Sequence, residues 1–395
     1  MDDCVETAPA RRPVAAPTSG SRRLPQLDNL RTGLIAWIIG GHALVGYSAI
    51  GGWEYAEVRE VTLRPRVELV LSAILGPSAL LVIGTFFFIA GLLVPRSVAK
   101  HGWRRFVLDR AVRLGVPYLA FALLLWPLLL WLTYRAAGRP VSYRWIFTER
   151  KPLLDAGPLW FVAVLLIFSV GYALLVRVGL LATEPRTTPG PLRGVHLVAL
   201  AVGLALATFV VRLWFPARGT QPGDLHLWQW PQCAAMFGLG IAGAPRGVAT
   251  RVPDRLRRGG GFTVLITVAM LPVVAALIGV SQLGRDVGPF LGGWRWQALF
   301  TATVEAVMVV AGSVWLLGTA QRLFTGTGRL ALASSRGAYA AFIVQGPILL
   351  GLALAVRPLP VAVELKAFLV AAAGIAGSFW LGRLLVTRTP LGRAL

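Results

Sequence analysis

The chain has 395 residues, of which 56% are hydrophobic and only 14% charged, and its formal net charge is +22. Soluble domains usually contain about 25% charged residues, so this composition predicts a polytopic membrane protein and excludes an ordinary soluble domain. The positive charge does not indicate a nucleic-acid partner. The basic residues fall mostly in short segments between apolar stretches, where membrane proteins carry their orientation signals.

Residues 1–26 are polar and rich in Pro and Arg, and they lack the apolar core of a signal peptide. We expect them to form a disordered cytoplasmic tail, followed by one membrane domain over residues 27–395. The two cysteines and four histidines are scattered, so we expect neither a disulfide framework nor a metal site.

Ten apolar segments meet or approach the length of about 20 residues that a transmembrane helix needs. They are 30–50, 68–95, 111–134, 158–181, 194–215, 228–245, 261–281, 296–319, 337–356 and 364–386. Breakers separate them, among them RSVAKHGWRR at 96–105 and RGVATRVPDRLRRGGG at 246–261. The sequence therefore predicts an all-α fold of about ten transmembrane helices, with the short, Gly-rich sixth segment the weakest.

The basic residues also predict an orientation. Most of the 39 Lys and Arg residues lie in the two terminal tails and in the loops after the even-numbered segments. By the positive-inside rule, both termini are expected in the cytoplasm, with the protein spanning the inner (plasma) membrane.

The first segment, LDNLRTGLIAWIIGGHAL, contains Arg31 and His42. Eleven residues are about three helical turns and a rise of about 16 Å, so both side chains share a face. This spacing predicts Arg31 at the cytoplasmic mouth and His42 near the middle of the bilayer. Arg110 and Arg113, at i and i+3, share a face at the start of the third segment.

These residue types suit a phosphate-bearing cytoplasmic ligand that reaches inward to a base. Arginine binds phosphate in bidentate fashion, and histidine transfers protons near neutral pH. Ordinary structural roles stay open, because arginines at helix ends anchor to the interface and a lone membrane histidine often only bonds another helix. Glu305, inside the eighth segment, is either functional or paired with a buried Arg or His. Gln345 and Gln232 fit interhelical hydrogen bonds equally well.

Several segments carry a family resemblance. The first places Arg31 and His42 in an Arg-x10-His pattern, and RRFVLDRAVRLGVPYL places Arg110 and Arg113 in Arg-x-x-Arg. FFFIAGLLV (86–94), GPLWFVAVLLIF (157–168) and SSRGAYAAFIVQGPIL (334–349) follow. In order and spacing, these segments resemble the acyltransferase-3 family of integral-membrane acyltransferases over residues 24–395. The opening and the TPLGRAL ending are most similar to its periplasmic-glucan succinylating branch.

The chain departs from the family pattern at two motifs. Gln345 stands where many members have histidine, and Gly157-Pro158 replaces a polar-His lead-in to the LWF motif. Any role of those histidines is therefore filled differently in this protein.

The resemblance implies transfer of an acyl group, of the acetyl or succinyl class, from cytoplasmic acyl-CoA to a hydroxyl of a carbohydrate or glycoside. The phosphates of CoA would be held by Arg31, Arg110 and Arg113. His42 would act as general base or carry the acyl group transiently.

Four further residues are assigned to this site. Glu305 would orient the imidazole if the first and eighth segments pack together. Trp160, Tyr339 and Gln345 are expected to bind the substrate. Acyl-CoA would be the donor substrate rather than a resident cofactor, and a homodimer stays open.

Two other classes of protein fit the same features. A transporter or flippase of an anionic or lipid-linked molecule would also have ten spans and intramembrane charge. Transporters often show inverted repeats with broken helices, and the sequence shows no internal repeat. A non-catalytic component of envelope assembly is the third alternative.

Overall fold

The structure, a computed structural model, describes residues 24–153, 155–183, 190–219, 221–278 and 287–389. Within these residues every regular element is a helix. The predicted disordered tail lies outside the described residues except for its last positions, and Pro25 and Gln26 already belong to the first helix. Proline suits the first position of a helix because it lacks the N–H that would be unpaired there.

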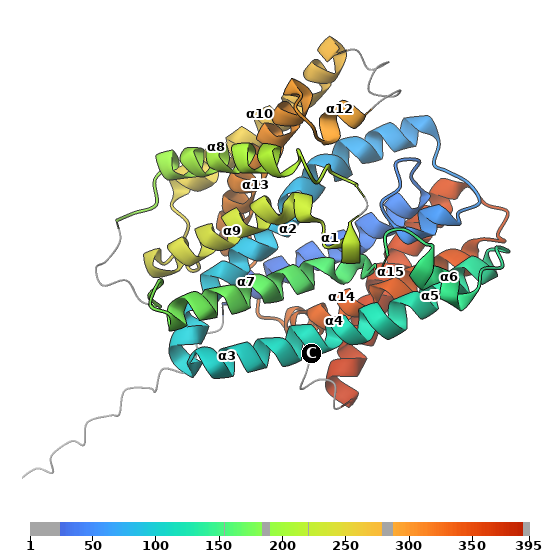
Figure 1. The fold of residues 1–395 in the computed structure, drawn as a ribbon, viewed down its shortest axis with the longest axis horizontal. Coiled ribbons are helices and arrows are strands. Elements are labelled where there is room, and N and C mark those ends of the chain that lie inside the picture. The colour runs from blue at the N-terminus through green and yellow to red at the C-terminus, as the bar shows by residue number, and fades with distance from the viewer. Residues whose placement is uncertain (1–23, 154, 184–189, 220, 279–286, 390–395) are drawn as a thin grey trace, which may run out of the picture.

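The long helices follow the ten predicted segments in order (Figure 1). The third is built of five consecutive elements: α3 (Trp103–Arg110), η2 (Ala111–Gly115), α4 (Val116–Ala120), η3 (Phe121–Leu125) and α5 (Trp126–Ala136). The other nine are α1 (Pro25–Tyr47), α2 (Pro65–His101), α7 (Trp160–Arg177), α8 (Gly194–Val211), α9 (Trp230–Gly243), α10 (Asp254–Ile278), α13 (Trp296–Leu323), α14 (Arg329–Val356) and α15 (Val363–Arg388). Shorter helices are η1 (Glu54–Glu57), α6 (Tyr143–Thr148), η4 (Gly157–Leu159), η5 (Pro222–Asp224), η6 (Leu227–Gln229), η7 (Ala244–Arg246) and α12 (Gly288–Leu291).

Among the described residues, eight helices are long and apolar enough to cross a membrane. The two remaining long segments are α1, which carries Arg31 and His42, and α9, which has only 14 residues. The prediction of an all-α polytopic membrane protein is confirmed.

Two expected breaks are wrong in extent. The break predicted at 96–105 is a single residue, Gly102 with φ 75°, because α2 runs to His101 and α3 begins at Trp103. Likewise α10 begins at Asp254, inside the loop predicted over 246–261. Charged residues mark where the apolar part of a helix stops, but the helix itself extends into the polar interfacial region.

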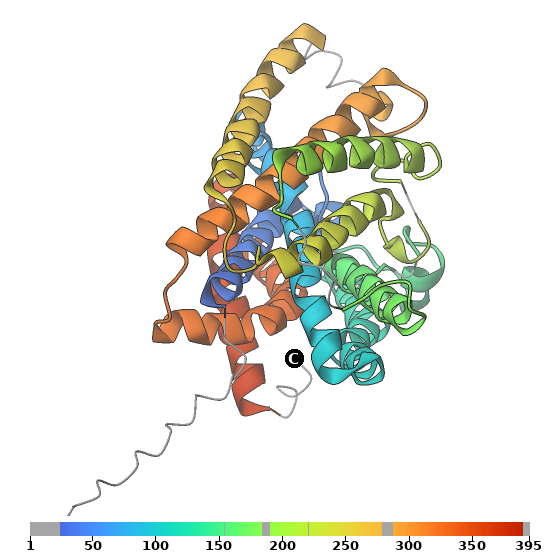
Figure 2. The ribbon, with the colours of Figure 1, turned by 90° about the vertical axis from the view of Figure 1, so that its left-hand side faces the viewer.

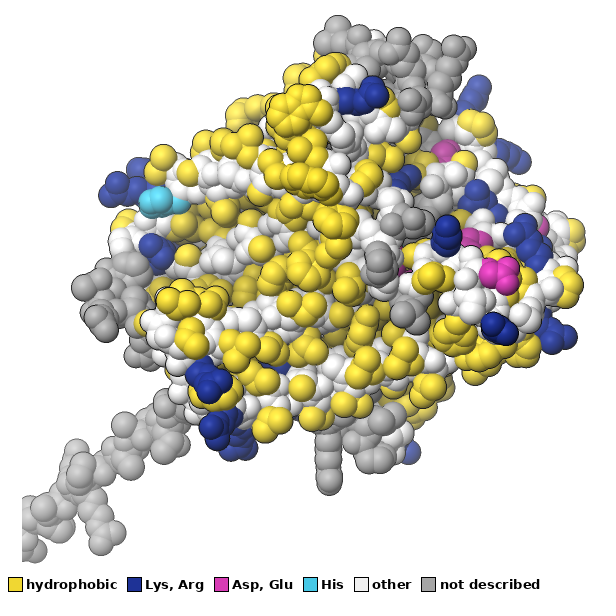
Figure 3. Space-filling view, viewed as in Figure 1, with side chains coloured by type: hydrophobic (Ala, Val, Ile, Leu, Met, Phe, Trp, Pro, Cys, Tyr) yellow, Lys and Arg dark blue, Asp and Glu magenta, His cyan; other side chains and the backbone are white. Residues whose placement is uncertain are grey.

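The loops gather at two ends of the bundle. At one end, the Asn29 side chain donates to the carbonyls of Phe324 and Gly326, at 2.8 and 2.9 Å. At the other, Lys366 pairs with Glu60 at 3.0 Å. Figure 3 shows an apolar band between two charged margins, with acidic side chains only at the right-hand one. We name the end with Asn29 the inner end and the opposite one the outer end, following the orientation predicted from charge.

Close glycine contacts bring α2 and α9 together, and the two helices lie side by side in both ribbon views (Figures 1 and 2). A Cβ added to Gly240 would collide with the Phe88 carbonyl oxygen and lie 2.7 Å from the Gly91 Cα. Small residues allow such close backbone approach, which is a principal source of helix association in membranes.

Replacing Gly240 with alanine is expected to separate α2 from α9 and to reduce the free energy of unfolding by about 1–3 kcal/mol. The measurement is thermal unfolding of the purified protein in detergent. Gly238→Ala is the matched control, because a Cβ at Gly238 meets nothing within 4 Å. Equal melting temperatures for the two variants would contradict this packing.

Candidate active site

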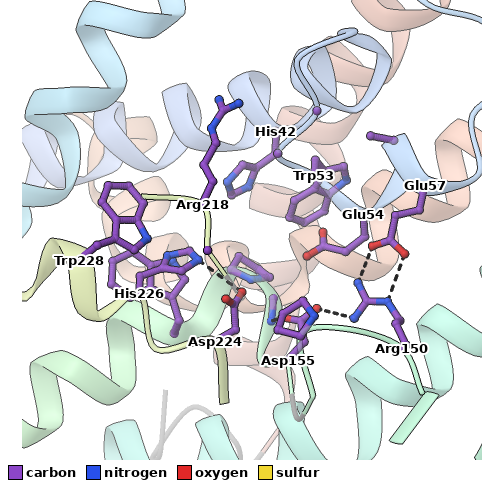
Figure 4. A pocket seen from close by; sticks show the side chains of 18 of the residues that line it. His42, Trp53, Glu54, Glu57, Arg150, Asp155, Arg218, Asp224, His226 and Trp228 are labelled. Atoms are coloured by element: carbon purple, nitrogen blue, oxygen red, sulfur yellow. Dashed lines mark hydrogen bonds and ion pairs between the residues drawn. The ribbon is translucent and has the colours of Figure 1, made fainter. Parts of the chain in front are cut away.

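Two cavities meet at His42. A cavity of about 630 Å³ lies among three outer-end loops, residues 48–64, 137–159 and 212–229 (Figure 4). We call it the outer cavity, and its lining includes His42, Trp53, Glu54, Asp155, His226 and Trp228. A second cavity of about 350 Å³, the apolar cavity, also contacts His42 and is lined by Ile38, Val45, Val82, Ile83, Phe161 and Phe342. His42 therefore lies where a polar space adjoins an apolar one.

A hydrogen-bond chain fixes the tautomer of His42. The Nδ1 atom of His42 lies 3.0 Å from Gln345 Oε1, and Gln345 Nε2 donates to the Phe342 carbonyl at 3.0 Å. Because a carbonyl only accepts, this network assigns the amide nitrogen to Phe342 and its oxygen to His42. The hydrogen must then lie on Nδ1, and Nε2 keeps its lone pair. Among the described residues no group hydrogen-bonds Nε2.

Trp53 packs on one face of the His42 imidazole. Its ring stacks on that of His42 with centroids 4.5 Å apart and planes 13° from parallel. The turn that returns the chain after α1 contains Gly51 and Gly52, at φ 72° and 112°, a backbone region that glycine adopts readily. The sequence GGW therefore brings an aromatic face back onto the helix that has just ended.

A buried arginine joins two of the outer loops. Arg150 is 4% exposed and pairs with Glu57 at 2.6 Å and Asp155 at 2.9 Å. Asp155 also accepts from Trp126 Nε1 and from the Gly157 backbone N–H. Burial alone would lower the pKa of Arg150, but the carboxylates raise it above its ordinary value. This network ties residues 48–64 to residues 137–159 and so fixes two walls of the outer cavity.

Glu54 lies beside this network without joining it. Its Oε2 atom is buried and has no hydrogen-bond partner among the described residues. Burial and the negative charge of Asp155 raise the pKa of the Glu54 carboxyl well above its ordinary value. The shift favours the neutral carboxyl, which can donate a hydrogen bond into the outer cavity.

The structure gathers the three predicted arginines at the inner end. The charges of Arg31 and Arg110 are close enough to repel each other, as are those of Arg110 and Arg113. Arg113 pairs with Asp109 at 3.0 Å, and both side chains are about half exposed. The Nε atom of Arg110 is buried and lacks a hydrogen-bond partner among the described residues. An anion bound there would satisfy that donor and offset the repulsion.

The predicted substrate residues lie in different places. Trp160 lines both cavities, and Gln345 contacts His42 directly. Tyr339 lies at the inner end, where its hydroxyl donates to the Arg113 backbone carbonyl at 3.2 Å. Tyr339 thus joins α14 to the arginine-bearing helix rather than lining either cavity.

Glu305 does not make the contact expected of it. α13 does pack against α1, but the Glu305 carboxylate pairs with Arg212 at 2.6 and 3.2 Å. Of the alternatives open from the sequence, pairing with a buried arginine is confirmed. Arg212 is 1% exposed at the end of α8, and a buried guanidinium requires such a partner. Gln345, not Glu305, orients His42.

Sequence reasoning missed most of the outer cavity. Glu54, Arg150 and Asp155 lie in stretches predicted only as connections, and His226 was one of four scattered histidines. Their signal was the acidic and aromatic content of the loops after the odd-numbered segments. Within the part of the chain that the structure describes, no three His, Cys, Asp or Glu side chains gather to hold a metal ion.

The fold defines a multi-pass membrane protein with a histidine site between two cavities. Residues 24–386 match the acyltransferase-3 family, described as an acyltransferase domain. The match covers most of the chain, so the protein belongs to this family and is a membrane acyltransferase. No curated protein and no solved structure is significantly similar to it.

The Arg212–Glu305 pair yields a stability prediction. Arg212→Met is expected to cost about 3–5 kcal/mol of unfolding free energy, because it leaves the Glu305 carboxylate buried without a partner. Arg212→Met combined with Glu305→Leu should recover most of that loss. Thermal unfolding in detergent measures both, and a double variant less stable than either single one would contradict the pairing.

Proposed function

We propose that the protein transfers an acetyl- or succinyl-class acyl group from cytoplasmic acyl-CoA to a hydroxyl of a carbohydrate or glycoside. The observation that carries this proposal is the imidazole of His42, whose Nδ1–H is held by Gln345 while Nε2 keeps its lone pair. A base in this state at the junction of two cavities suits proton abstraction from a hydroxyl. Family membership favours acyl transfer over the transport function that the sequence left open.

In the proposed reaction, the acceptor oxygen attacks the thioester carbonyl carbon while His42 Nε2 takes the hydroxyl proton. A carbon–oxygen bond forms and the carbon–sulfur bond breaks. The departing CoA thiolate then receives the proton from the imidazolium. The Gln345 oxygen accepts from Nδ1–H throughout and stabilises the positive charge that develops on the ring.

The donor would enter from the inner end. Arg31, Arg110 and Arg113 offer positive charge and an unpaired buried N–H to the phosphates of CoA. Along α1, Arg31 lies about 16 Å from the level of His42. The apolar cavity extends inward from His42 to Ile38 and suits the acyl group and the arm that carries it.

The acceptor would occupy the outer cavity. Its volume of about 630 Å³ lies within the range of about 300–1,000 Å³ typical of small-molecule sites. Carboxyl groups and aromatic rings line it together, and both suit a sugar, since carboxylates accept hydroxyl hydrogens and rings pack on its C–H faces.

The direct test is His42→Ala. CoA release from acetyl-CoA and succinyl-CoA is followed with a thiol reagent, with methyl β-D-glucopyranoside as acceptor probe. Loss of a general base is expected to slow release by about 10²–10⁴-fold, while His101→Ala, at an exposed residue, should react normally. A His42→Ala protein that turns over like the parent would refute the base assignment.

Arg110→Ala tests binding of the donor separately from binding of the acceptor. Losing a charged hydrogen bond worth about 1.5–3 kcal/mol should raise the KM for acyl-CoA by about ten-fold or more, with the KM for the glucoside unchanged. Arg105→Ala, an exposed arginine on the same helix, is the matched control. Equal KM values for acyl-CoA in both variants would show that Arg110 does not bind the donor.

A further inference from the structure

The loop over residues 212–229 has an unusual backbone. Three residues other than glycine have positive φ among those described, and all lie in this loop: Arg218 at 62°, Asp224 at 46° and His226 at 47°. A left-handed conformation is unfavourable for residues with a Cβ and persists only where the surroundings enforce it. All three side chains line the outer cavity.

Several contacts enforce this conformation. The Leu227 N–H donates to Gln221 Oε1 at 2.6 Å, and Trp230 Nε1 donates to the Leu225 carbonyl at 2.9 Å. The Arg212 guanidinium lies over the ring of Trp228, with its Cζ atom 5.0 Å from the centroid of that ring. Because Glu305 fixes Arg212, the loop is anchored to the buried ion pair.

The loop presents a second imidazole to the cavity that contains His42, as Figure 4 shows. His226 Nε2 lies 3.3 Å from Asp224 Oδ2, and its ring lies 4.3 Å from that of Trp160. His226 Nδ1 is buried and has no hydrogen-bond partner among the described residues. The Asp224 carboxylate beside Nε2 favours the hydrogen on Nε2, and this leaves the lone pair of the neutral ring on Nδ1.

A hydroxyl group satisfies this nitrogen in either state of the ring. It donates to Nδ1 of the neutral imidazole and accepts from Nδ1–H of the protonated one. A buried polar atom left unpaired is unfavourable, so the site favours a ligand that places a hydroxyl there.

We infer that His226, positioned by Asp224, binds a second hydroxyl of the acceptor, distinct from the one that reacts at His42. This inference rests on the proposed function, and it specifies an acceptor with at least two hydroxyls. Two-point binding would place one particular hydroxyl at His42 and so determine which position of the acceptor is acylated.

The test measures binding separately from transfer. Full-length protein in a detergent without sugar groups, such as lauryl dimethylamine oxide, is titrated with methyl β-D-glucopyranoside, and tryptophan fluorescence gives the Kd. His226→Phe keeps a ring against Trp160 but removes the nitrogen, and we expect it to raise the Kd at least ten-fold. His226→Asn, which retains a polar group, should recover part of the affinity, and His101→Phe should match the parent.

A second readout distinguishes binding from mere support of the fold. NMR of the acylated glucoside should show one dominant position for the parent and a mixture for His226→Phe. Glucoside affinity and product pattern unchanged in His226→Phe would overturn the inference and leave the role of His42 intact. Saturable binding with no CoA release by the parent would instead refute the proposed function, and no saturable binding by the parent would overturn the inference.

Discussion

A histidine near the outer end of an apolar helix needs a hydrogen-bond partner, and Gln345 supplies it to His42. The amide is itself fixed by the Phe342 carbonyl, so its oxygen faces Nδ1 and the lone pair of the ring remains on Nε2. Trp53 packs on the face of the same imidazole. The proposed role of His42 as a base depends on this one orientation of its ring. So does the proposed approach of donor and acceptor from the two cavities that meet there.

The polar walls of the outer cavity depend on two buried arginines. Arg150 pairs with Glu57 and Asp155 and so joins two loops. Arg212 pairs with Glu305 and supports the loop of His226 through Trp228. Both guanidinium groups are almost fully buried, and each pairs with at least one carboxylate at close range, which is what burial of a charge requires. Together they support a polar cavity at the outer end of an apolar bundle.

Patterns within single segments of the sequence predicted the helices and the residues that share a helix face. The ten segments, the shared face of Arg31 and His42, and the i,i+3 arginines follow from helical periodicity and apolar length. The partner of Glu305 depends on which helices become neighbours, and α8 brings Arg212 to α13. The sequence also marked Gln345 as a departure from the family pattern, but only its placement opposite His42 shows what the amide does.

The outer loops were beyond sequence reasoning for another reason. They contain only short helices and no long apolar periodicity, and their residues act across long separations, as Arg150 does with Glu57. The left-handed backbone at Asp224 and His226 leaves only a weak mark in residue type, since neither is glycine and Asp and His adopt positive φ only somewhat more readily than other residues. The loop residues of the candidate site therefore could not be predicted from the sequence, and only the structure shows that the three loops line one cavity.

The central claim is that neutral His42 carries its proton on Nδ1 and faces the cavities with an unprotonated Nε2. The chain has only four histidines, so ¹⁵N NMR of histidine-labelled protein, with assignment by His42→Ala, reports the tautomer directly. We predict an Nδ1–H tautomer for neutral His42 that becomes mixed in Gln345→Leu. An Nε2–H tautomer in the parent protein, or no change in Gln345→Leu, would contradict it.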